Sequence, residues 1–325
     1  MPAPETITLL HRPLPVEQGQ VLPLTRRLRT AGYTVHQRED GAHELRNTDL
    51  LWVQANPNLF PRALSILRSL PRAERPRVLL WFSEPLPMPR AAGLTPAALT
   101  LRERAKRWLS DPRTNDVESN LDTLKALHEE GLVDVWATST PARQAVLEEH
   151  GIRAGLAPLG YEPDRDGRPL GQPRDIDVLF LGEVVRRRRG LLRRLERSGL
   201  RVEVRGSWYD PDCWGEARTR LLNRTRVFLN LARHPGELPG YRFVLGMANG
   251  CLVASEPVYA PGWFQPGTHY LEAPPHQLAD AILAVLGDED HRRALAAAGT
   301  RLVQEELTLE HSVRLLTAML ESAQA

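Results

Sequence analysis

Apolar runs alternate with amphipathic stretches along most of the chain. The runs are short and rich in Val, Ile, Leu and Phe, and most are followed by apolar positions at helical spacing. This alternation is typical of βα units, in which helices cover both faces of a parallel sheet. We therefore expect an α/β fold.

The apolar runs fall into two series. The first series predicts strands at 6–10, 33–37, 50–53, 78–82 and 133–137, and helices at 18–31, 61–70, 119–130 and 140–150. The second series predicts strands at 176–182, 202–205, 227–232 and 251–255, helices at 187–198 and 214–223, and a helical end over 275–323.

A segment rich in Pro, Gly and Asp, residues 161–175, separates the two series. Because this composition is typical of a linker, we predict two Rossmann-like domains, 1–160 and 176–325. A chain of 325 residues also exceeds the usual size of a single domain. Ligands of such folds bind at the carboxyl ends of the strands, so we expect a ligand cleft between the domains.

Composition and charge exclude several classes of protein. Lys106 and Lys125 are the only lysines among 42 basic residues, and 40 acidic residues are interspersed with them. The net charge is +2, and no basic stripe indicates a nucleic-acid partner. With neither a leader peptide nor a long apolar stretch, we expect a cytoplasmic protein without a membrane segment. The two cysteines, Cys213 and Cys251, indicate neither a disulfide framework nor a metal cluster.

The stretch ELPGYRFVLG, residues 237–246, lies between two strand-like runs. Proline is tolerated in the first helical turn and glycine permits close approach, so a helix is predicted to begin near Gly240. The free N–H groups of such a helix suit a diphosphate. A plain βαβ crossover, ended by Gly250 in a left-handed conformation, explains the same spacing. Glu237 and Arg242 beside the helix start shift the balance towards a functional site.

The stretches GELPGYRFVLGMANGCLVASE and GWFQPGTHYLEAPPHQLADAILAVLGDEDHRRALAAAG show a family resemblance. They resemble the nucleotide-sugar-binding half of GT-B glycosyltransferases of the group 1 type, most of all the spore-maturation-protein (CgeB)-like branch. Glu237, Gly240, Gly250 and the FQPG at 264–267 stand where those families carry their motifs. The resemblance covers about residues 174–323, and the first half matches only as a generic Rossmann-like domain.

The resemblance implies transfer of a sugar from a nucleotide-diphosphate sugar to an unidentified acceptor, with retention of configuration. Glu237 is the expected catalytic contact to the donor sugar, and Gly240 lets the backbone approach it. Arg242 and the adjacent Tyr241 are further candidates for donor binding. No group of acidic, His or Cys residues is arranged to hold a divalent ion, so we expect neither a metal nor a cofactor. The oligomeric state stays open.

The stretch FLGEVVRRRR, residues 180–189, predicts a strand that ends at Gly182 and a helix that begins with four arginines. In the resembling families this loop faces the diphosphate, which makes Arg186 or Arg188 a candidate phosphate partner. The planar guanidinium suits bidentate phosphate contacts. A solvated helix start is the alternative for each arginine.

Further donor-binding candidates follow the next two predicted strands. VEVRGSWYD places Gly206 and Trp208 after 202–205, where Trp208 either stacks on the base or caps the core. LNLARHPGE adds Asn230 and His234, with an ordinary loop role as the alternative for His234.

Glu84 follows the predicted strand 78–82 in the first series. A carboxylate at that position is a candidate general base for an acceptor hydroxyl. Capping of a helix or pairing with an arginine is the alternative.

Leu245 stands where the larger group 1 family carries a second glutamate, which by resemblance would hold the donor ribose. A leucine side chain cannot accept hydrogen bonds from hydroxyl groups. Leu245 therefore favours a rival function, a non-catalytic nucleotide-sugar-binding protein. A nucleotide-sugar epimerase shares the architecture and is a further alternative.

Overall fold

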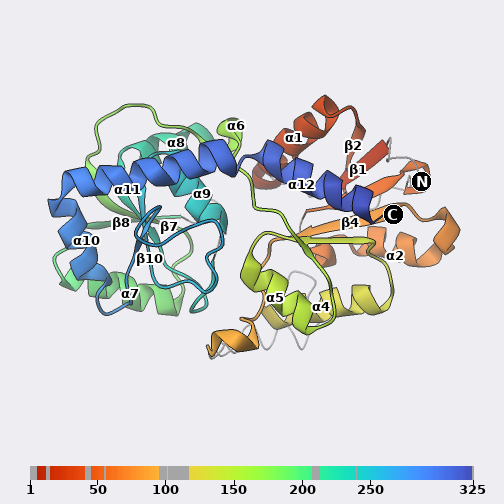
Figure 1. The fold of residues 1–325 in the computed structure, drawn as a ribbon, viewed down its shortest axis with the longest axis horizontal. Helices are drawn as coiled ribbons and strands as arrows, with labels where there is room; N and C mark the ends of the chain where they lie inside the picture. The colour runs from red at the N-terminus through yellow and green to blue at the C-terminus, as the bar shows by residue number, and fades with distance from the viewer. Residues whose placement is uncertain are drawn as a thin grey trace. The chain divides into compact units, whose positions relative to one another are not determined.

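The computed structural model describes residues 6–11, 15–40, 45–54, 56–94, 101, 117–206, 213–238 and 240–323. The chain divides into two compact units. Unit 1 comprises Met1–Pro158 and Leu309–Ala325, and unit 2 comprises Leu159–Thr308. Each unit contains one parallel sheet with helices packed against it (Figure 1).

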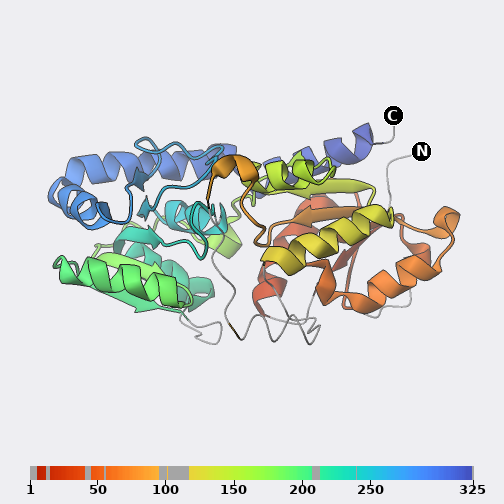
Figure 2. The same cartoon turned by 90° about the horizontal axis from the view of Figure 1, so that it is seen from below.

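Unit 1 contains a six-stranded parallel sheet in the order β2-β1-β3-β4-β5-β6. Its strands are β1 (Thr6–Leu10), β2 (Thr34–Arg38), β3 (Leu50–Val53), β4 (Arg77–Phe82), β5 (Val135–Thr138) and β6 (Gly155–Leu156). The main helices between them are α1 (Pro15–Thr30), α2 (Pro61–Ser69), α4 (Val117–Glu129) and α5 (Pro141–Glu149). Strands β3 and β5 are buried along their whole length, as expected of a sheet covered on both faces (Figure 2).

Unit 2 contains a five-stranded parallel sheet in the order β11-β10-β9-β7-β8. Its strands are β7 (Ile176–Leu181), β8 (Val202–Arg205), β9 (Thr225–Asn230), β10 (Leu252–Ser255) and β11 (Leu271–Glu272). Its helices are α6 (Pro163–Asp166), α7 (Arg186–Arg197), α8 (Gly215–Asn223), α9 (Gly240–Ala248), α10 (Leu278–Gly287) and α11 (Glu289–Arg301), and a π-helical turn, η6 (Leu302–Glu306), follows.

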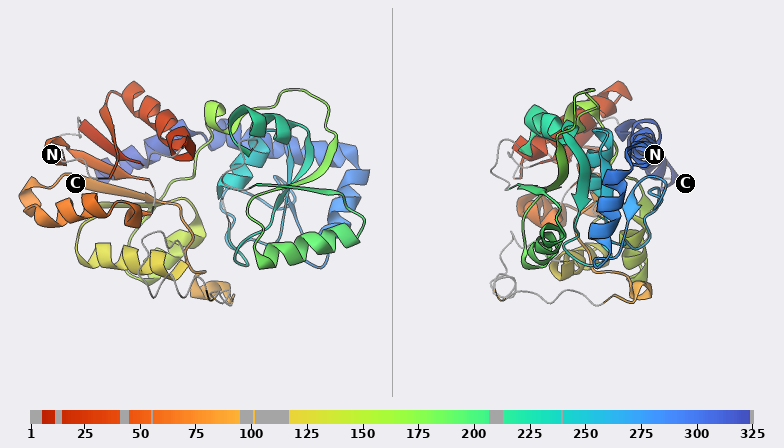
Figure 3. Two further views of the ribbon diagram at one scale, coloured as in Figure 1. Left: turned by 180° about the vertical axis from the view of Figure 1, so that it is seen from behind. Right: turned by 90° about the vertical axis from the view of Figure 1, so that its left-hand side faces the viewer.

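The alternation of side chains along β9 divides the core of unit 2 between the two faces of the sheet. Phe228 packs in a cluster with residues of α8 and α9, whereas Val227 and Leu229 pack in another with residues of α7 and α10. The helices accordingly flank the sheet on both sides (Figure 3). Every predicted strand has its counterpart in the described part of the chain, and the predicted and observed ends agree to within two residues.

Two domain boundaries differ from those predicted. The last helix, α12 (Leu309–Ser322), belongs to unit 1, where its buried face packs against α1, β5 and β6. There Ser312 donates a hydrogen bond to the carbonyl oxygen of Pro158 (2.8 Å).

The segment predicted to be a linker, 161–175, belongs to unit 2. Asp166 is fully buried and pairs with Arg165 at 2.7 Å, and Asn249 donates to its carbonyl oxygen (2.7 Å). These specific polar contacts, which composition does not reveal, hold the segment on α8 and α9.

Gly250 ends α9 as predicted, with a φ of 72°. Its N–H donates to the carbonyl oxygen of Met247, and the N–H of Cys251 donates to that of Gly246, both at 3.0 Å. This pattern satisfies two carbonyl groups that the end of the helix leaves open. Among the described residues, each helix is too short or too polar to cross a lipid bilayer.

Candidate functional site

The carboxyl ends of β7 and β8 approach each other closely. The N–H of Gly182 donates to the carbonyl oxygen of Arg205 (2.8 Å), and a Cβ atom on Gly206 would lie 2.7 Å from the Gly182 nitrogen. Gly206 also has a φ of 115°, a backbone conformation that residues other than glycine rarely adopt. A Cβ on Gly182 would lie 3.0 Å from Nη2 of Arg242, so this glycine leaves room for the guanidinium group.

Arg188 is the third residue of α7, and its side chain is buried. Its Nε donates to the carbonyl oxygen of Leu231 (2.8 Å), and its Nη1 donates to that of Glu183 (3.1 Å). The guanidinium carbon lies 5.7 Å from the centre of the Phe180 ring. The buried arginine is therefore held at the carboxyl end of β9.

Arg242 is the third residue of α9 and is half-buried. Its Nη1 donates to Oδ1 of Asn230 (3.2 Å) and to the carbonyl oxygen of Leu231 (3.3 Å), and its guanidinium carbon lies 5.5 Å from the Phe180 ring centre. The buried Asn230 in turn donates to Oγ of Ser255 (2.8 Å). Asn230 thus positions Arg242.

The two guanidinium groups carry positive charge that no carboxylate balances directly. In the described part of the chain, neither Arg188 nor Arg242 forms an ion pair. Burial lowers the pKa of both, the charge of Arg188 further lowers the pKa of Arg242, and Glu237 opposes both effects. Because the ordinary pKa of arginine lies far above neutrality, both stay protonated.

Both arginines also stand in the first turn of a helix, where positive charge opposes the helix dipole. Neither first turn contains an acidic residue, and α7 has no side-chain cap. An anion at this place would satisfy two helix N-termini and two guanidinium groups together. The arrangement is therefore suited to bind a phosphate or diphosphate.

Glu237 lies in a tight turn with His234, and its negative charge acts on both Arg188 and Arg242. The N–H of Glu237 donates to the carbonyl oxygen of His234 (3.2 Å), and Oε2 of Glu237 accepts a long hydrogen bond from the His234 N–H (3.4 Å). The carboxylate is half-buried and acts on the pKa of Arg188 and Arg242. The structure therefore brings Glu237 into the same region as both guanidinium groups.

The arginines at the start of α7 have different environments. Arg186 is exposed, whereas Arg187 forms an ion pair with the buried Glu256, at 2.5 Å between Nη2 and Oε1. Glu256 also accepts a hydrogen bond from the N–H of Ala232 (3.3 Å). Arg187 thus fixes the start of α7 to the end of β10, a role that the sequence did not indicate.

The three other candidates are Tyr241, Glu84 and Trp208. The Tyr241 ring contacts the guanidinium groups of Arg165 and Arg218, at 5.5 and 6.0 Å from its centre. Glu84 follows β4 in unit 1, and its carbonyl oxygen accepts a hydrogen bond from Nε of Arg143 (2.9 Å). Trp208 lies outside the described residues, so its role stays a prediction.

Leu245 is buried in the hydrophobic core of unit 2. Its side chain belongs to the cluster that α9 forms with the sheet, and its carbonyl oxygen accepts a hydrogen bond from Nδ2 of Asn249 (2.9 Å). The buried side chain of Leu245 therefore offers no hydrogen-bond acceptor to a ribose. Within the described ranges, no group of three His, Cys, Asp or Glu side chains is placed to hold a metal ion.

Known proteins with a similar sequence or structure include glycosyltransferases. Residues 186–318 match the family model described as glycosyl transferase-like. No curated protein matches the sequence. The structure is similar to HepE of Anabaena in complex with UDP and glucose, with a TM-score of 0.60 and 11% identity over 98% of this chain and 99% of HepE.

Two further structures share the fold. AviGT4, a glycosyltransferase involved in avilamycin A biosynthesis, has a TM-score of 0.52 and 14% identity over 98% of this chain and 99% of AviGT4. TarM has a TM-score of 0.58 and 9% identity over 85% of this chain, which spans about half (55%) of TarM. The protein therefore has the predicted GT-B fold, whereas the CgeB-like branch stays a prediction.

Proposed function

We propose that this protein is a glycosyltransferase that moves a sugar from a nucleotide-diphosphate sugar to an acceptor. The observation that carries this proposal is the pair Arg188 and Arg242, unpaired with carboxylates in the described chain and placed at two helix N-termini. Charge develops on the diphosphate as it leaves the sugar, and fixed positive groups stabilise that transition state. The match of 186–318 to glycosyl transferase-like domains supports the same reaction.

In this proposal Glu237 contacts the donor sugar, while the first turn of α9 and the two arginines bind the diphosphate. By the family resemblance, the reaction retains configuration. It needs no metal ion, because the arginines provide the positive charge that a divalent cation would otherwise supply. A uridine nucleotide is the first donor to test, since the similar HepE structures contain UDP and UDP-glucose.

Thermal unfolding with UDP, GDP, dTDP, ADP and CDP tests the donor site. A ligand that binds only the native state stabilises it by about 2.7 kcal/mol at a concentration one hundred times its Kd. We expect one nucleotide, UDP, to raise the midpoint clearly. Arg188→Ala should abolish the shift, whereas Arg189→Ala, an exposed neighbour on the same helix, should retain it. No shift with any nucleotide would refute the proposed donor site.

A non-catalytic nucleotide-sugar-binding protein is the second candidate, and the buried Leu245 favours it. Prolonged incubation with UDP-glucose separates the candidates. A transferase releases UDP slowly as the sugar passes to water, a binding protein leaves the donor intact, and an epimerase converts it to an isomer without releasing UDP.

A further inference from the structure

A second charged region lies at the opposite end of the sheet of unit 2. A groove of about 770 Å³ runs along the segment before β7, the start of β9 and one side of α11. Arg174 precedes β7, Arg226 is the second residue of β9, and Gly250 precedes β10. The groove is therefore at the amino ends of the strands, whereas Arg188 and Arg242 are at the carboxyl ends.

The groove has a strong excess of positive charge. Five arginines and one carboxylate line it: Arg174, Arg226, Arg292, Arg293, Arg301 and Glu289. The whole chain, in contrast, has nearly equal numbers of basic and acidic residues, 42 and 40. The local excess therefore exceeds what the composition alone would produce.

The side chain of Arg292 lines the groove but is buried, with only 3% of the residue's surface exposed. Its Nε and Nη2 donate to the carboxylate of Glu289 at 2.8 and 2.7 Å, and its Nη1 makes only a long contact with the carbonyl oxygen of Arg226 (3.4 Å). A guanidinium group has five N–H bonds. Among the described residues, the second N–H of each terminal nitrogen has no acceptor.

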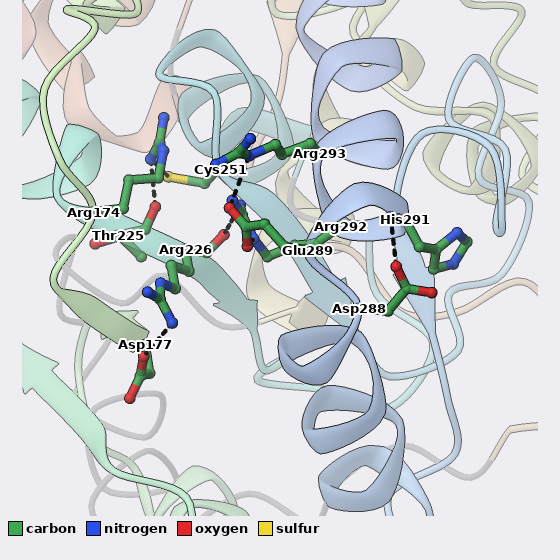
Figure 4. A network of polar contacts seen from close by, with 10 residues as sticks. All are labelled: Arg174, Asp177, Thr225, Arg226, Cys251, Asp288, Glu289, His291, Arg292 and Arg293. Atoms are coloured by element: carbon green, nitrogen blue, oxygen red, sulfur yellow. Dashed lines mark hydrogen bonds and ion pairs between the residues drawn. The ribbon is translucent and has the colours of Figure 1, made fainter.

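Glu289 is shared between two cations, since Nε of Arg293 also donates to it at 2.8 Å (Figure 4). The hydrogen bond from Arg292 lowers the pKa of Glu289 to about 2. One carboxylate thus balances two guanidinium groups, and the groove keeps its net positive charge.

Arg174 and Arg226 come from the other side of the groove (Figure 4). Arg174 donates to carbonyl oxygens at the ends of α8 and α9, those of Leu222 (3.1 Å) and Asn249 (2.8 Å). Arg226 donates to Asp177 at 3.2 Å. These contacts hold both side chains in place. Arg293 and Arg301 are exposed on α11.

We propose that this groove is a second anion-binding site, which takes a small soluble molecule with two or more phosphate charges. The planar forks of the exposed arginines suit bidentate phosphate contacts, and the buried Arg292 supplies further N–H donors. The groove has a volume of about 770 Å³, and the net charge of the whole chain is only +2, which together favour a small ligand over a nucleic acid. This site is separate from the proposed donor site.

Calorimetric titration of the full chain with inorganic pyrophosphate at constant ionic strength tests the site. The variant Arg293→Ala/Arg301→Ala removes two exposed cations, so the fold should be retained. Because both substitutions remove charged hydrogen-bond donors from the groove, we expect the groove affinity to fall by at least about tenfold. The matched control, Arg153→Ala/Arg314→Ala, removes the same charge from exposed positions in unit 1 and should bind like the unmodified protein.

Hydrogen exchange locates the bound pyrophosphate. Protection over 289–301 that is lost in the Arg293/Arg301 variant supports the proposal. Equal affinity in both variants, or protection confined to the starts of α7 and α9, would overturn it. Arg188→Ala reports separately on the donor site, so failure of the proposed function and failure of this site give different results.

Discussion

Arg188 and Arg242 donate hydrogen bonds to the same carbonyl oxygen, that of Leu231, at 2.8 and 3.3 Å. They come from two helices far apart in the sequence, and each is the third residue of its helix. One carbonyl group at the end of β9 therefore holds two like charges side by side. Holding two like charges side by side destabilises the folded protein when no anion is bound, and a bound anion would offset that destabilisation.

The first prediction concerns the cost of this arrangement. In Arg242→Met, the protein without ligand should unfold at an equal or higher temperature, because a poorly compensated charge has been removed. Its affinity for UDP should fall on the order of tenfold or more, as a charged hydrogen-bond donor is lost. Calorimetry with UDP, together with thermal unfolding without ligand, measures both effects. A less stable variant that still binds UDP normally would contradict this account.

The second prediction concerns Gly246, which lies inside α9 where the helix crosses the sheet. A Cβ there would lie 2.6 Å from the Phe228 ring and 2.8 Å from Cγ2 of Val253. Gly246→Ala should therefore destabilise the protein by about 1–3 kcal/mol through overpacking. Gly190 is a helical position with open space around it, so Gly190→Ala should stabilise the protein by up to about 1 kcal/mol. Urea unfolding of both variants decides, and similar effects at the two sites would refute the packing argument.

The third prediction separates two ion pairs of unit 2. Arg187→Ala leaves the carboxylate of Glu256, which is 5% exposed, without its partner, and should cost about 3–5 kcal/mol. Arg233→Ala removes a pair with the exposed Glu183 and should cost at most about 1 kcal/mol. The free energies of unfolding of the two variants should differ accordingly. Equal losses would mean that the Arg187 pair is not structural.

The fourth prediction is a pH dependence. The hydrogen bond from Arg292 lowers the pKa of Glu289 from about 4.5 to about 2. The native state thus binds the proton less tightly than the unfolded state, so the stabilisation is complete above pH 4.5 and is lost as the pH falls towards 2. Urea midpoints at pH 6 and pH 3 should accordingly differ less in Glu289→Gln than in the unmodified protein. Glu305→Gln, at an exposed position, serves as control and should keep the full difference.

The predicted linker shows where a local pattern can mislead. Its Pro, Gly and Asp content is typical of a mobile connection, yet Asp166 is fully buried and its carbonyl oxygen is bound by Asn249. The partners lie 83 residues apart in the sequence. Composition describes the conformational freedom of a segment, but it contains no information about such distant partners.

The sequence by itself determined the main strands of both sheets and their sequence along the chain, the start of α9 at Gly240 and its termination by Gly250, but not the short elements β6, β11 and α6. These features depend on local periodicity and on the conformations that proline and glycine permit. The motifs also predicted Gly182, Gly206 and the arginine-rich start of α7 as parts of one donor site, and the structure places the two glycines next to each other.

Only the tertiary structure decided which arginine at the start of α7 is exposed, which is paired and which is buried. Arg186 is exposed, Arg187 pairs with Glu256, and Arg188 is buried beside Leu231. The partner of Arg187 lies 69 residues further along the chain, and the acceptor of Arg188 lies 43 residues further. Adjacent arginines are equivalent in a local pattern, whereas burial and pairing depend on which distant strand ends meet them when the sheet assembles.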